Sequence, residues 1–142
     1  MRKRHQRQDE IRRIVREERI RTQRDLVEKL EERGYTCTQA TVSRDITEMS
    51  LRKLPEGVYV LAEDLHLQRM IAELVESVVH TNNLVLVKSS TGTAPGVAAA
   101  LDGADLEGIL GSIAGDDTIL VITSDEESAQ KLQDQIDKFR GE

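Results

Sequence analysis

The sequence predicts an α/β chain of two small domains, an N-terminal winged helix-turn-helix over residues 1–62 and a C-terminal α+β domain over residues 63–142. First, helix-spaced apolar residues before and after a short turn are followed by a strand–turn–strand pattern. Second, residues 1–62 hold 15 Lys and Arg against 11 Asp and Glu, whereas residues 63–142 hold 5 against 15. Third, helical patterns and short β-branched runs in the second half predict helices packed on a small, mainly antiparallel sheet.

The overall composition limits the class of protein. Of 142 residues, 38% are hydrophobic and only 2% aromatic, so two small aliphatic cores are expected. Each would be marginal alone, which favours a homo-oligomer. The single Cys37 excludes an internal disulfide framework and a cysteine-based zinc site. With no signal peptide and no apolar run of roughly 18 residues, we expect a cytoplasmic protein without membrane contact.

The first domain is predicted to contain three helices and a hairpin. Residues 7–18 form the first helix, and Thr22 caps a second helix that ends at Gly34, with Asp25 completing a capping box. Thr38 caps the third helix, whose apolar side carries Val42, Ile46 and Met49. Residues 51–54 and 58–61 then form a hairpin around Pro55-Glu56-Gly57, which is typical of the wing in winged-helix modules.

The third helix has small polar groups and one arginine on the side opposite its apolar residues. Such a side can approach a DNA groove closely, although any surface helix between two turns is the simpler alternative. The preceding helix, the hairpin and the basic balance favour DNA. The predicted contacts to double-stranded operator DNA are Gln39, Ala40, Thr41, Ser43, Arg44 and Thr47 on the helix, and Arg52 and Lys53 on the hairpin. The basic start, Arg2-Lys3-Arg4 with Arg7, is either a DNA-tracking arm or a solvated tail.

The second domain is predicted to run helix, strand, helix, strand, strand, helix. Its first helix covers residues 65–80, on the apolar spacing from Leu67 to Val78, and Asn82-Asn83 ends it. A strand at 84–87 and a loop at 91–96 lead into an alanine-rich helix that ends near residues 102–103. Two strands follow at 106–114 and 118–123, and the last helix carries Ala129 to Phe139.

The turn Gly115-Asp116-Asp117 joins the last two strands. It is an ordinary hairpin turn or, because adjacent carboxylates repel each other, a site for a cation. No ligand spacing for a metal is evident, and a guanidinium would satisfy the carboxylates equally well. Gly92-Thr93-Ala94 and Asp102 are candidates for the other end of such a ligand. No nucleophile–base pair is apparent, so an enzyme is not expected.

Two segments, Thr38–Ile46 and Gly108–Val121, resemble the bacterial arginine repressor family, and the resemblance extends from about residue 7 to residue 139. It implies a winged helix-turn-helix that binds palindromic operators of arginine-metabolism genes. It also implies an oligomerisation and ligand-binding domain that forms trimers paired into hexamers, with L-arginine as corepressor between subunits and no metal. By matching position, Ser43 and Arg44 contact DNA and Asp116 and Asp117 hold the guanidinium. Gly92, Thr93, Ala94 and Asp102 face the amino-acid end, and Ser112 lines the pocket.

One position departs from the family pattern. Many relatives carry Gln or His where this chain has Pro95, and proline offers neither a side-chain hydrogen bond nor a backbone donor. Three alternatives stay open: a winged-helix regulator that senses a different small molecule, a metabolic enzyme domain fused to a DNA anchor, and an architectural protein that bends DNA.

Overall fold

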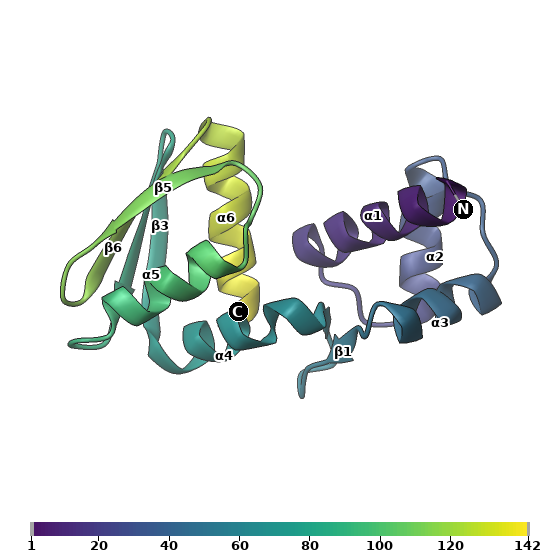
Figure 1. The fold of residues 1–142 in the computed structure, drawn as a ribbon, viewed down its shortest axis with the longest axis horizontal. Helices are drawn as coiled ribbons and strands as arrows, with labels where there is room; N and C mark the ends of the chain where they lie inside the picture. Colours follow the sequence, from purple (N-terminus) through teal and green to yellow (C-terminus); the bar gives the residue numbers. More distant parts are fainter. Residues whose placement is uncertain (1, 142) are drawn as a thin grey trace. The chain divides into compact units, whose positions relative to one another are not determined.

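The computed structural model describes residues 2–141, which divide into two compact units, one ending at Ala62 and the other beginning at Glu63 (Figure 1). The first unit contains α1 (Arg2–Glu17), α2 (Gln23–Glu32), α3 (Gln39–Glu48), β1 (Arg52–Lys53) and β2 (Tyr59–Val60). β1 and β2 pair as an antiparallel hairpin directly after α3. This is the winged helix-turn-helix that the sequence predicts.

An aliphatic core holds the three helices of the first unit together. Ile11 and Ile14 of α1, Leu26 and Leu30 of α2 and Val42 of α3 are fully buried. Burial of each such side chain contributes roughly 1.5–3 kcal/mol. The core therefore fixes α3 through one buried edge and leaves its opposite edge to solvent.

Side-chain caps set the start of both later helices. The Thr22 hydroxyl accepts a hydrogen bond from the Asp25 amide at 3.0 Å, and the Asp25 carboxylate accepts one from the Thr22 amide at 3.2 Å. The predicted capping box is thus confirmed. The Thr38 hydroxyl accepts from the Thr41 amide at 3.2 Å, which fixes where α3 begins.

The basic start of the chain is neither a solvated tail nor a free arm. It belongs to α1, which begins at Arg2 rather than at residue 7. The side chains of Arg4 and Arg7 form ion pairs with Glu48 and Asp45 of α3. These pairs, which connect residues about 40 positions apart in the chain, favour helix over coil at the amino end.

The 3-10 turn η1 (Ala62–Asp64) spans the boundary between the units, and the second unit forms a single antiparallel sheet with helices. Its elements are α4 (Leu65–Leu74), β3 (Val75–Thr81), β4 (Leu84–Ser89), α5 (Ala94–Gly103), β5 (Ile109–Ala114), β6 (Thr118–Thr123) and α6 (Glu126–Phe139). The strand order is β3-β4-β6-β5, and every neighbouring pair is antiparallel. The predicted α+β architecture is confirmed.

The predicted helix over residues 65–80 is wrong in its second half. α4 ends at Leu74, and residues 75–81 form strand β3. The run Val75-Glu-Ser-Val-Val-His-Thr is rich in β-branched residues, and pairing with β4 supplies its backbone hydrogen bonds. Asn82 and Asn83 form the two-residue turn of this hairpin, with Asn82 at φ 51°. The strand predicted at 106–114 likewise begins at Ile109.

The two faces of the sheet differ in what covers them. Val85, Val87, Ile119 and Val121 alternate along β4 and β6 and are buried on the face that carries the helices. On the other face, which we call the open face, large apolar side chains reach solvent: Val79 is 55% exposed, Leu110 71% and Ile113 67%. No helix within residues 2–141 is long and apolar enough to cross a membrane.

Candidate functional sites

The recognition helix α3 presents its predicted DNA contacts to solvent. Gln39, Ala40, Arg44 and Thr47 are exposed, and Thr41 and Ser43 are half-buried. The Thr47 hydroxyl donates to the Ser43 carbonyl at 3.3 Å, one helical turn earlier. The exposed edge therefore carries short side chains and a single long cation, which suits close approach to base edges and phosphates.

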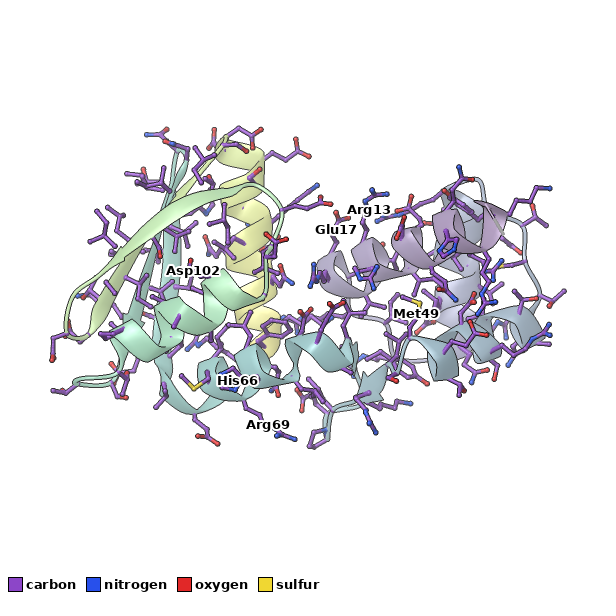
Figure 2. The ribbon with its side chains drawn as sticks, in the orientation of Figure 1. Arg13, Glu17, Met49, His66, Arg69 and Asp102 are labelled. Carbon is purple, nitrogen blue, oxygen red and sulfur yellow. The ribbon has the colours of Figure 1, made fainter. Side chains whose placement is uncertain are left out.

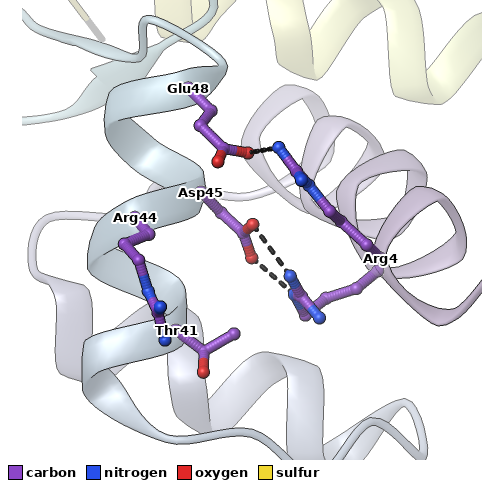
Figure 3. A pocket seen from close by; sticks show the side chains of 6 residues that line it. Arg4, Thr41, Arg44, Asp45 and Glu48 are labelled. Carbon is purple, nitrogen blue, oxygen red and sulfur yellow. Dashed lines mark hydrogen bonds and ion pairs between the residues drawn. The ribbon is translucent and has the colours of Figure 1, made fainter. Parts of the chain in front are cut away.

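Arg44 is the unpaired cation of this edge. Within residues 2–141 its guanidinium has neither an ion pair nor a hydrogen bond, although it lines a shallow pocket with Arg4, Arg7, Thr41, Asp45 and Glu48. Figure 3 shows the ion pairs of the pocket as dashed lines and Arg44 outside them. An unpaired arginine needs to break no internal contact before it binds a phosphate or a guanine.

The neighbouring Asp45, in contrast to the exposed Arg44, is buried and hydrogen-bonded. It is 1% exposed, and the Arg7 guanidinium grips it with two hydrogen bonds, one of them 2.9 Å from Nη2 to Oδ1. The Gln8 amide donates to the same oxygen at 3.0 Å. Burial raises the pKa of Asp45, but the hydrogen bonds from Arg7 and Gln8 outweigh it and hold that pKa below its usual value. Asp45 thus holds the buried side of α3 against α1.

The wing carries two more predicted contacts. Arg52 and Lys53 are exposed on β1, and the Lys53 ammonium lies 5.3 Å from the centre of the Tyr59 ring. The tip of the hairpin is held by Arg21, whose guanidinium donates to the Glu56 carbonyl at 3.0 Å. The Tyr59 amide donates to the Ile20 carbonyl at 2.8 Å, so the wing is fixed to the helical core.

In the second unit, the fold brings together two of the predicted segments that lie about 24 residues apart. The Gly92 amide donates to the Asp116 carboxylate at 3.2 Å, and the Ala94 amide donates to the Asp116 carbonyl at 3.1 Å. The turn at 92–94 and the β5–β6 turn therefore form one end of this unit (Figure 1). Gly92, at φ 79°, adopts the left-handed conformation that this turn needs.

Two neighbouring carboxylates, those of Asp116 and Asp117, lie at this end of the unit. Asp116 and Asp117 are both exposed, and within residues 2–141 neither takes part in an ion pair. Asp117 accepts one hydrogen bond, from the Thr118 hydroxyl at 2.9 Å. One oxygen of each carboxylate therefore stays available, in a unit with an excess of 10 acidic over basic residues. This geometry suits a planar cation with several N–H donors.

Two other predicted ligand residues lie elsewhere. Asp102 is exposed near the carboxyl end of α5 (Figure 2), and α5 begins at Ala94. At a rise of 1.5 Å per residue, the two positions are roughly 12 Å apart along the helix. Ser112 pairs with Val121 and so belongs to the face that carries the helices. Within one protomer, most of the length of α5 therefore separates Asp102 from the 92–94 turn.

Several residues around these sites were not among the predicted ones. Arg7 and Gln8 hold Asp45, and Lys88 contacts Thr118 next to Asp117. The position of Asp45, three residues after buried Val42, was a signal of its inward orientation. Within residues 2–141 no group of three or more His, Cys, Asp or Glu is placed to hold a metal ion.

A wing and an exposed recognition helix, followed by a separate α+β unit, define a two-domain winged-helix DNA-binding regulator. The sequence profile described as "Arginine repressor, DNA binding domain" matches residues 2–67, and "Arginine repressor, C-terminal domain" matches residues 71–138. The chain belongs to the arginine repressor family.

Individual relatives agree over nearly the whole length of the chain. An arginine repressor of Carboxydothermus hydrogenoformans is 42% identical over 144 residues, which covers 94% of this chain and 96% of the relative. One of Thermus thermophilus is 45% identical over 136 residues, covering 88% and 83%. One of Staphylococcus saprophyticus is 40% identical over 146 residues, covering 96% and 97%. The chain is thus a DNA-binding transcriptional repressor rather than an enzyme.

Proposed function

We propose that this protein represses arginine-metabolism genes in the cytoplasm by binding palindromic operators as an oligomer, with L-arginine as corepressor. The observation that carries the proposal is the contact of Asp116 with the 92–94 turn, which brings the adjacent Asp117 to the same end of the unit. Two carboxylates lie side by side in the sequence there, and within residues 2–141 neither of them has an ion-pair partner. L-Arginine brings a guanidinium that matches two carboxylates through paired, charge-assisted hydrogen bonds.

The proposed site is completed by a neighbouring protomer. Asp102 is roughly 12 Å along α5 from the 92–94 turn, so a second copy of the chain supplies the group that completes one end of the ligand. The open face offers Val79, Leu110 and Ile113 for burial between copies. A ligand that binds only the assembled state stabilises that state, so arginine promotes the step from trimer to hexamer.

The oligomer then presents several recognition helices at once. Each exposes Gln39, Ala40, Arg44 and Thr47, supported by Arg52 and Lys53 on the wing. When one DNA-binding domain of the oligomer occupies a half-site of a palindrome, a second domain has a raised effective concentration at the other half-site. Arginine controls DNA affinity in this way without touching DNA.

Light scattering with and without L-arginine, run beside a gel shift on a palindromic operator, tests the proposal. We expect arginine to raise the oligomer mass and tighten operator binding. Asp117→Asn, which keeps the side-chain shape and removes the charge, is expected to weaken arginine binding in calorimetry by at least about tenfold while the fold is retained. Wild-type arginine affinity in Asp117→Asn would contradict the site.

A panel of other amino acids is the matched comparison. If citrulline, which has the length of arginine without its charge, tightened operator binding as well as arginine does, a different sensing chemistry would replace the proposed one.

A further inference from the structure

The backbone that carries the paired carboxylates is fixed from two sides. The Ser89 amide donates to the Asp117 carbonyl at 2.8 Å, and the Ala94 amide donates to the Asp116 carbonyl at 3.1 Å. The Gly115 amide closes the turn onto the Thr118 carbonyl at 2.8 Å. With the backbone held, the position of each carboxylate depends only on rotation about its own side-chain bonds.

Different donors restrict that rotation at the two aspartates. The Gly92 amide holds Asp116, as described above. At Asp117 the donor is a side chain: the Thr118 hydroxyl lies 2.9 Å from Oδ1. The same hydroxyl oxygen lies 2.9 Å from the Lys88 ammonium nitrogen. Lys88 and Thr118 are direct cross-strand partners of β4 and β6, so the sheet itself sets this contact.

The direction of these hydrogen bonds follows from the chemistry of the three groups. An ammonium only donates, and an ionised carboxylate only accepts. Lys88 therefore uses a lone pair of the Thr118 oxygen, and the single hydroxyl proton points to Asp117. Donation from a cation also polarises the hydroxyl, which strengthens its bond to the carboxylate.

We propose that Thr118 and Lys88 are positioning residues of the cation site: they hold Oδ1 of Asp117 so that Oδ2 lies in a fixed plane for a guanidinium. This inference rests on the proposed function, and it adds a source of ligand selectivity. A guanidinium needs its acceptors in its own plane, whereas a primary ammonium is a point charge that tolerates rotation of the carboxylate. Loss of the Thr118 hydroxyl is then expected to weaken the binding of L-arginine more than the binding of L-lysine.

Two substitutions at one position separate this role from a structural one. Thr118→Val keeps the β-branched shape and removes the hydroxyl, and Thr118→Ser keeps the hydroxyl. In calorimetry of the full chain, we expect Thr118→Val to bind L-arginine about tenfold more weakly and to lose part of its preference for L-arginine over L-lysine. Thr118→Ser restores both within about threefold. Thr81→Val, the same change at the other end of the sheet, leaves both unchanged.

Lys88→Met tests the second residue. If Lys88 only repelled the incoming cation, its removal would tighten arginine binding. We expect it to weaken binding instead, and to have no further effect in the Thr118→Val background, because both changes break one hydrogen-bonded chain. The control is Lys131→Met, at an exposed lysine on α6.

A readout without ligand keeps this inference separate from the proposed function. Three-bond NMR couplings of Asp117 are expected to report one side-chain rotamer in the wild type and averaged rotamers in Thr118→Val. Absence of arginine binding in the wild type contradicts the proposed function, and the couplings still decide the positioning. Averaged couplings in the wild type, or arginine binding by Thr118→Val equal to that of Thr81→Val, would overturn the positioning.

Discussion

The recognition helix carries an exposed arginine and a buried carboxylate at consecutive positions. Arg44 reaches solvent without a partner in residues 2–141, whereas Asp45 is enclosed by Arg7 and Gln8 of α1. Consecutive helical residues lie about 100° apart, so Arg44 faces solvent and Asp45 faces the protein. The proposed DNA contact of Arg44 is thereby separated from the Asp45 contacts that hold α3 against α1.

Arg44→Ala is expected to remove specific operator binding and to leave folding and assembly intact. A well-placed arginine–guanine contact contributes roughly 1–3 kcal/mol of binding free energy, and this contribution is lost at every DNA-binding domain of the oligomer. A gel shift on operator and scrambled duplexes measures the effect. The matched control is Arg24→Ala, at an exposed arginine on α2. Operator affinity equal to the wild type in Arg44→Ala would refute the assignment.

Arg7→Met is expected to lower the free energy of unfolding by about 3 kcal/mol at pH 7, because it leaves the Asp45 charge buried without its partner. In the double variant that also carries Asp45→Asn, we expect most of the lost unfolding free energy to be recovered, because no buried charge is left without a partner. Urea unfolding monitored by circular dichroism measures both. If Arg7→Met were as stable as the wild type, Asp45 would not depend on Arg7.

The same pair predicts a pH dependence. The folded state lowers the pKa of Asp45, so the carboxylate contributes stability above its unfolded pKa of about 4. That contribution is lost as the pH falls through the lowered folded value. Urea midpoints between pH 6 and pH 2 are expected to fall more steeply for the wild type than for Asp45→Asn, which has no proton to take up. Parallel curves would contradict this.

The connection into β5 packs closely against the start of α6. Gly108 has φ 82°, and its carbonyl accepts a hydrogen bond from the Ser124 amide at 2.9 Å. A Cβ at this position would lie 2.7 Å from the Ser128 Cβ at the start of α6. The loop and the helix approach each other closely only because residue 108 lacks a side chain.

Gly108→Ala is therefore expected to destabilise the protein by about 1–3 kcal/mol, from the positive φ and the clash together. Gly103→Ala is the control, because it ends α5 at an ordinary φ with no atom within 4 Å of the new Cβ. That change is expected to stabilise by up to about 1 kcal/mol. Equal shifts of the melting temperature in Gly108→Ala and Gly103→Ala would contradict the close packing of residue 108 against Ser128.

The open face of the sheet is the surface that we propose is buried between copies of the whole molecule. Leu110 and Ile113 on β5 and Val79 on β3 present apolar area that a monomer leaves in water. Exposed apolar area of this kind marks an interaction surface. The carboxylates of the β5–β6 turn follow directly after β5, so a copy that covers this face lies close to them.

Ile113→Glu is expected to reduce assembly without unfolding the protomer, because Ile113 is already 67% exposed. A buried unpaired carboxylate costs several kcal/mol in the assembled state. Light scattering measures the mass, and circular dichroism checks the fold. Ala72→Glu on the exposed side of α4 is the control. A wild-type mass for Ile113→Glu, with and without arginine, would exclude this face from the interface.

Elements whose pattern is local can be predicted from the sequence. Neighbouring residues are enough to predict several features: the caps at Thr22 and Thr38, the spacing around Val42, the wing, and the two acidic residues of the turn. The exposed edge of α3 followed in the same way, because helical geometry alone places Arg44 opposite Val42.

Features that depend on residues distant in the chain become visible in the folded protein alone. Residues 75–81 fit a helical spacing, yet pairing with β4 makes them a strand. The basic start becomes helix through its pairs with Asp45 and Glu48, and the 92–94 turn meets Asp116 through hydrogen bonds across the fold. Local propensity differs by a few tenths of a kcal/mol per residue, whereas core burial contributes roughly 1.5–3 kcal/mol per buried side chain. Core burial and strand pairing also act between segments that no short stretch of sequence contains.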